Sequence, residues 1–149
     1  MLLNRSNPVE RPFVSAARYA PIMLSLLRIM TGLLIMQHGT QKLFGFPEAS
    51  GRGMPPLFSL MGLAGVIELV GGLLIVIGLF TRPTAFLLAG FTAVAYFMAH
   101  ASKSFYPILN GGELAALYCF VFLYLMLAGA GPWSVDARRG LEGARTSRY

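Results

Sequence analysis

Two ionisable residues lie inside stretches of the sequence that are otherwise apolar. Glu68 is near the middle of "LFSLMGLAGVIELVGGLLIVIGLF", residues Leu57 to Phe80, a run long enough to cross a bilayer. Arg28 interrupts the first apolar stretch of the chain in the same way. A charge at the bilayer centre costs about 2.5–3.5 kcal/mol on insertion scales, so such residues are expected to pair or to serve a function.

Helical geometry predicts that these two residues meet. If the first helix ends near His38, Arg28 lies roughly 15 Å below that end, and Glu68 lies roughly 16 Å below the outer start of the second helix, at about 1.5 Å per residue. Small residues share their helix faces: Ser25, Thr31 and Gly32 near Arg28, and Ala64, Gly65, Gly71 and Gly72 near Glu68. We therefore predict an intramembrane ion pair, Arg28 with Glu68, across a close helix contact. The pair is either purely structural or part of a proton or ligand site. The remaining alternative is that the two side chains do not pair and that each snorkels independently toward water.

A second polar group gathers at the outer ends of the predicted helices. The segments "HGTQK" and "HASK" each place a lysine within four residues of a histidine, and "NGGE" opens the last apolar stretch. The candidate ligand or proton site comprises His38, Lys42, His100, Asn110 and Glu113. The alternative for Asn110 and Glu113 is a capping box, whose spacing they match. Each histidine is equally open to a plain interfacial hydrogen bond.

Haem and metal sites are conceivable at these histidines but are not favoured. Imidazoles on facing helices can supply both axial ligands of a haem, but the sequence has no haem-attachment motif. His38, His100 and Glu113 are acceptable metal ligands, yet their spacing is not diagnostic. Cys119 is the only cysteine, which excludes an internal disulfide and a thiolate metal cage. We assign no metal and no catalytic residue.

Four apolar stretches must position these residues: about 20–36, 57–80, 84–99 and 114–130. Apolar residues make up 56% of the chain and charged residues 12%. In lipid every backbone polar group must be satisfied internally, so the stretches are expected to be helices. We predict an all-α, integral membrane four-helix bundle. The first stretch is expected to be retained, because no small-x-small cleavage site follows it.

Basic residues predict the orientation of the bundle. Eight arginines (Arg5, Arg11, Arg18, Arg82, Arg138, Arg139, Arg145 and Arg148) fall on one set of sides, and Lys42, Arg52 and Lys103 on the other. The positive-inside rule then places both termini in the cytoplasm. The predicted organisation is a cytoplasmic segment at 1–19, the membrane domain at 20–131 and a polar cytoplasmic tail at 132–149. The net charge of +6 does not indicate nucleic-acid binding, because the charges flank apolar segments.

Several fragments together resemble the DoxX family of small four-helix membrane proteins. They are "LLRIMTGLLIMQHGTQKLFGF", "VIELVGGLLIVIGLFTR", "AYFMAH", "NGGELAALY" and "GAGPWSVDARR", and the resemblance runs from about Leu26 to Arg139. Each fragment alone is weak, but their order is specific. On the matching positions, the family pattern singles out Arg28, His38, Lys42, Glu68, Arg82, His100, Asn110 and Glu113.

The resemblance implies a role in redox metabolism, since founding members are associated with quinone-linked respiratory and thiosulfate-oxidising complexes. Others are linked to membrane oxidoreductase assemblies that handle oxidative stress. We therefore expect an inner-membrane subunit that contacts lipid and binds a quinone-like ligand or a partner oxidoreductase, and that is not an enzyme by itself. The alternatives are a non-catalytic assembly or scaffold protein and a small transporter, which would need to be a homo-oligomer.

Overall fold

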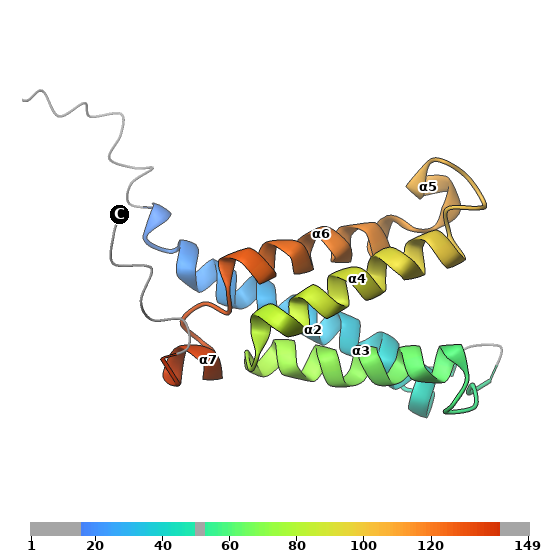
Figure 1. Ribbon diagram of the computed structural model, residues 1–149, viewed down its shortest axis with the longest axis horizontal. Coiled ribbons are helices and arrows are strands. Elements are labelled where there is room, and N and C mark those ends of the chain that lie inside the picture. The colour runs from blue at the N-terminus through green and yellow to red at the C-terminus, as the bar shows by residue number, and fades with distance from the viewer. Residues whose placement is uncertain (1–15, 50–52, 141–149) are drawn as a thin grey trace, which may run out of the picture.

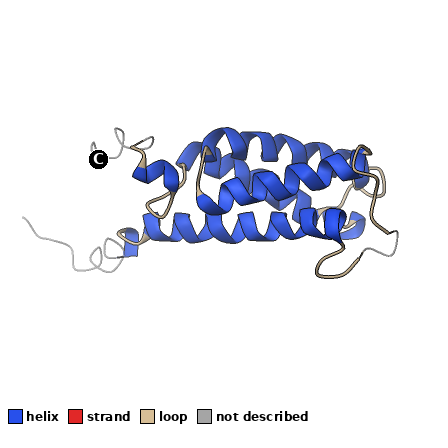
Figure 2. Ribbon diagram, turned by 90° about the horizontal axis from the view of Figure 1, so that it is seen from below, coloured by secondary structure: helices blue, strands red, loops and turns tan. Residues whose placement is uncertain are grey.

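The computed structural model describes residues 16–49 and 53–140, and in these residues it contains helices and no strand (Figure 2). Four long helices form the bundle: α2 (Ala20–Phe44), α3 (Leu60–Ile77), α4 (Thr81–Ala99) and α6 (Glu113–Ala128). Two short helices, α5 (Pro107–Asn110) and α7 (Val135–Arg138), lie at opposite ends (Figure 1). The prediction of an all-α bundle is confirmed. The first three long helices have the length and hydropathy of membrane spans, and α6 is a shorter apolar helix.

Glycines in the left-handed region end the first two helices. Gly45 ends α2 at φ 64°, and Gly78 ends α3 at φ 68°. The sequence analysis ended the first apolar stretch at Met36 and placed His38 at the end of the helix. That placement is wrong: the helix continues through the polar segment to Phe44, and His38 lies inside it.

Helices α2 and α3 cross so closely that only glycine fits at the contact. A Cβ added to Gly39 would lie 2.5 Å from the backbone nitrogen of Leu69, and one added to Gly72 would lie 2.9 Å from the carbonyl oxygen of Gly32. The small-residue contact between the first two helices is therefore confirmed. Gly71 is an exception, because it faces Leu88 of α4 instead.

The bundle has two ends, which we name after the charged residue that each one holds. The Arg28 end comprises the start of α2, the α3–α4 turn, the end of α6, and α7 (Figure 1). The Lys42 end comprises the end of α2, the start of α3, the end of α4 and the start of α6. Residues 16 and 140 both belong to the Arg28 end, so an even number of spans separates them. Which end faces the cytoplasm stays a prediction.

The bundle has a small buried core and an apolar exposed surface. Between the two ends, the buried core consists of Ile35, Ile75, Ala85, Leu88, Ala89, Tyr118, Phe122 and Leu125. Large apolar side chains such as Met30, Val70 and Leu87 are exposed on the helices that surround it. Such a surface is unfavourable in water and suits hydrocarbon, which supports a membrane location for the bundle.

Candidate functional site

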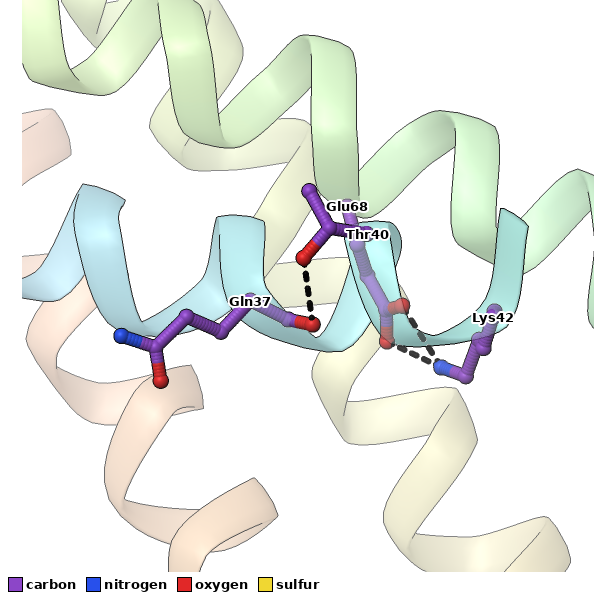
Figure 3. A network of polar contacts seen from close by, with 4 residues as sticks. All are labelled: Gln37, Thr40, Lys42 and Glu68. Atoms are coloured by element: carbon purple, nitrogen blue, oxygen red, sulfur yellow. Dashed lines mark hydrogen bonds and ion pairs between the residues drawn. The ribbon is translucent and has the colours of Figure 1, made fainter. Parts of the chain in front are cut away.

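A lysine and a glutamate form an ion pair between α2 and α3 at the Lys42 end. The Lys42 ammonium lies 2.5 and 2.6 Å from the two carboxylate oxygens of Glu68 (Figure 3). The Glu68 side chain is 7% exposed, and that of Lys42 is 22% exposed. Within the described part of the chain, this is the ion pair that the structure contains. The side-chain amide of Gln37, also on α2, points away from the pair (Figure 3).

Two aromatic residues extend this ion pair into a polar cluster. The His38 ring meets the Tyr118 ring edge-on, with centroids 6.2 Å apart. Tyr118 lies within electrostatic range of the Glu68 carboxylate, and His38 within that of the Lys42 ammonium. We call Lys42, Glu68, His38 and Tyr118 the ion-pair cluster. It brings a cation, a carboxylate, an imidazole and a phenol together from three helices, all groups that can donate or accept a proton.

The predicted partner of Glu68 is wrong. The sequence analysis paired it with Arg28, but the structure pairs it with Lys42. Arg28 and Lys42 are fourteen residues apart, which is about 21 Å along a helix. Because α2 continues past His38, the level of Glu68 corresponds to the last turns of α2 and not to its middle.

Arg28 instead donates hydrogen bonds to backbone carbonyls at the other end of the bundle. Its Nε donates to the carbonyl oxygen of Ala130 at 2.7 Å, and its two Nη atoms donate to the carbonyls of Ile75, Val76 and Trp133. Ile75 and Val76 belong to the last turn of α3, where helix carbonyls have no partner within the helix. The negative end of the helix dipole also favours a cation there. Arg28 is fully buried, and these bonds explain how a guanidinium is tolerated there.

Asp136 holds the chain after α6 against the Arg28 end. Its carboxylate accepts hydrogen bonds from the backbone nitrogens of Phe80 (2.9 Å), the N-cap of α4, and Thr81 (2.8 Å), its first residue. Its own backbone nitrogen donates to the Gly78 carbonyl at 2.9 Å. The sequence analysis missed this residue and assigned the segment to a polar tail. Ser134, the N-cap of α7, was a local signal in the sequence that a helical turn begins here.

His100 and Asn110 organise the connection between α4 and α6. The His100 Nδ1 lies 3.0 Å from the Asn110 carbonyl oxygen. The Asn110 side chain donates to the Ser104 carbonyl (2.9 Å) and to the Tyr96 hydroxyl (3.3 Å), and it accepts from the Gly112 nitrogen (2.7 Å). The capping-box alternative for Asn110 does not hold, since Asn110 ends α5 and Gly112 is the N-cap of α6 without a side-chain cap.

The contacts of the predicted site residues therefore fall into two groups. His38 and Lys42 belong to the ion-pair cluster, whereas His100 and Asn110 fasten the loop around α5. Glu113 is exposed at the first position of α6. Convergence of all five residues on a single ligand stays a prediction. In the described residues, no three histidine, cysteine, aspartate or glutamate side chains are placed to hold one metal ion.

Sequence comparisons give the family of this chain. A family model for DoxX matches residues 23–101, which span α2, α3 and α4. The chain belongs to the DoxX family. An uncharacterised protein of Haemophilus influenzae is 44% identical over 123 residues, covering 80% of this chain and 92% of that protein. The residues that the DoxX family model matches include Arg28, Lys42 and Glu68, so the ion pair lies within the DoxX region.

Two further relatives carry informative names. The inner membrane protein YphA of Escherichia coli is 30% identical, over 79% of this chain and 91% of that protein. The putative oxidoreductase CatD of Bacillus subtilis is also 30% identical, over 74% of this chain and 82% of that protein. No solved structure matches the chain. This DoxX protein is thus a membrane protein with relatives in several bacteria.

Proposed function

We propose that this DoxX protein is an inner-membrane subunit of a redox system, and that it binds the headgroup of a quinone-like molecule at the ion-pair cluster. The observation that carries the proposal is the Lys42–Glu68 pair between otherwise apolar helices. His38 lies one helical turn before Lys42 on α2, and its ring contacts Tyr118. A quinone takes up two protons and two electrons on reduction. The cluster supplies groups that exchange protons with the quinone oxygens, and a partner oxidoreductase supplies the electrons.

The names of two relatives support this proposal. CatD is named a putative oxidoreductase and YphA an inner membrane protein. The apolar surface of the bundle also suits a lipid-soluble ligand, which reaches such a site from the bilayer and not from water.

Quinone titration of the purified protein tests the proposal. The protein in an uncharged detergent is titrated with a short-chain ubiquinone and a short-chain naphthoquinone, and bound quinone is measured by equilibrium dialysis against protein-free micelles. Saturable binding is expected, weakened about tenfold in Glu68→Gln, which corresponds to loss of roughly 1.4 kcal/mol from charge-assisted hydrogen bonding. Glu48→Gln is the matched control, because Glu48 is an exposed carboxylate at the same end.

Quinone uptake that is no greater with protein than in protein-free micelles would contradict quinone binding at this cluster. So would equal quinone binding by the Glu68→Gln and Glu48→Gln variants. A second candidate function, a non-catalytic assembly protein, would then be favoured by the loop contacts of His100 and Asn110. These side chains hold a fixed surface at the Lys42 end, and their replacement by alanine would reduce co-purification of a partner without any change in quinone binding.

A further inference from the structure

Four arginines are exposed around the Arg28 end, on three separate parts of the chain. Arg18 precedes α2, Arg82 lies in the first turn of α4, and Arg138 and Arg139 lie at the end of α7. The bonds from Asp136 to the first residues of α4 fix α7 beside that helix (Figure 1). The end of α7, which carries Arg138 and Arg139, therefore lies at the same end of the bundle as the first turn of α4, which carries Arg82.

These charges have no exposed carboxylate near them within the described residues. Asp136 is the acidic residue described at this end, and it is buried against two backbone nitrogens. The other described carboxylates, Glu48, Glu68 and Glu113, belong to the Lys42 end. Within the described residues, the Arg28 end thus offers several exposed cations and no exposed carboxylate.

The surroundings of the cluster indicate the headgroup level of a membrane. Trp133, Phe80 and Tyr19 are exposed at this end, and aromatic side chains favour the interface between lipid and water. Arg82 donates to the carbonyls of Met126 and Leu127 at 2.9 and 2.8 Å, so its guanidinium lies level with the last turn of α6.

An apolar surface continues from Arg82 along α4. Phe86 and Gly90 follow it at four-residue intervals on the same face, and Leu87 lies beside them. Phe86 and Leu87 are exposed, and a Cβ built on Gly90 would meet no atom within 4 Å. A cationic group above an open apolar face matches a molecule with an anionic head and an acyl chain, whereas an acidic protein surface would match the arginines alone.

We propose that Arg82, Arg138 and Arg139 bind the phosphate of an anionic phospholipid, with an acyl chain along the exposed face of α4. The planar guanidinium donates two parallel hydrogen bonds to phosphate oxygens, which a neutral zwitterionic headgroup satisfies less well because its own cation competes. Arg18 adds to the attraction from the start of α2. This site is independent of the quinone proposal, since it lies at the opposite end of the bundle.

Thermal unfolding with added lipid tests the site. The full chain, purified in dodecyl maltoside and freed of lipid, is mixed with phosphatidylglycerol or phosphatidylcholine, and the unfolding temperature is measured as a function of lipid concentration. Phosphatidylglycerol is expected to raise the unfolding temperature more than phosphatidylcholine does. The double variant Arg138→Gln with Arg139→Gln is expected to bind phosphatidylglycerol roughly 10- to 30-fold more weakly at low salt.

Lys103→Gln is the control, because Lys103 is an exposed cation at the Lys42 end, and it is expected to keep the full response. If the double variant unfolds earlier even without lipid, native mass spectrometry of lipid adducts below both unfolding temperatures makes the same comparison. Equal responses to the two lipids, or an unchanged response in the double variant, would overturn the proposal. The proposal would also be overturned if inorganic phosphate raised the unfolding temperature as much as phosphatidylglycerol does. Binding of an acidic protein at these arginines in place of lipid would overturn it as well.

Discussion

The Lys42–Glu68 pair predicts a specific pattern of stability in single and double variants. Two unit charges about 4 Å apart attract by about 4 kcal/mol at an effective dielectric constant of 20. Desolvation offsets much of this, but loss of one partner leaves the other buried. Lys42→Met is expected to cost about 3 kcal/mol, near the lower limit for broken buried pairs, because Glu68 is almost fully enclosed. Glu68→Met is expected to cost less, about 1–2 kcal/mol, because the 22% exposed Lys42 reaches toward water.

The double variant Lys42→Met with Glu68→Met is expected to be at least 1 kcal/mol more stable than the sum of the two single losses predicts, since no charge is left unpaired. Reversible unfolding in mixed detergent micelles measures all three variants, and Lys103→Met, at an exposed lysine, serves as the control. Losses that simply add in the double variant would show that the two charges do not stabilise each other, and would refute this account of the pair.

Four further predictions follow from the fold. Arg28→Lys should destabilise the protein by about 2–4 kcal/mol in the same unfolding assay, because a lysine cannot reach carbonyls in three directions as the guanidinium does. Asp136→Ala should cost about 1–2 kcal/mol and speed amide exchange at the start of α4, with Asp136→Asn milder. In the same unfolding assay, Gly39→Ala should destabilise the protein strongly, because the added Cβ would collide with the backbone of Leu69. Gly90→Ala should have no effect on stability, because its Cβ would meet no atom within 4 Å. A reporter fused to the C-terminus should give a cytoplasmic signal, and one inserted in the α2–α3 loop should give a periplasmic signal. A periplasmic signal from the C-terminal fusion would contradict the predicted topology.

The main features of the fold could be predicted from local properties of the sequence. Hydropathy located the helices, because a bilayer requires long apolar runs. Gly32 and Gly72 of the α2–α3 contact were also predicted, since small residues at helical spacing mark close approach in membranes. Gly39 was not, because the predicted helix ended before it. Both features depend on residues within a few turns of each other, which is the range over which a sequence pattern is reliable.

The partners of the charged residues could not be predicted in the same way. The segment "QHGTQKLF" is polar enough to suggest the end of a helix, but its residues can all continue one, and α2 stops only at Gly45. Ending the helix near His38 and not at Phe44 is an error of six residues, about 9 Å, and starting the second helix at Leu57 and not at Leu60 adds about 4.5 Å in the same direction. Both errors moved the predicted level of Glu68 away from Lys42 and toward Arg28. The contact of Asp136 with Phe80 and Thr81 joins positions 55 or more residues apart. A pattern within a few neighbouring residues cannot predict such a contact.

The two charged sites of the bundle differ in a way that bears on function. Arg28 is fully buried, and its hydrogen bonds go to backbone carbonyls, which cannot take up or release a proton. Its arrangement suits a fixed support for the end of α3. Lys42 and Glu68 bond to each other through side chains that both exchange protons, Lys42 remains partly exposed, and His38 and Tyr118 lie alongside. A ligand can therefore compete for either member of that pair without disturbing the backbone, which makes the Lys42 end the better candidate for chemistry.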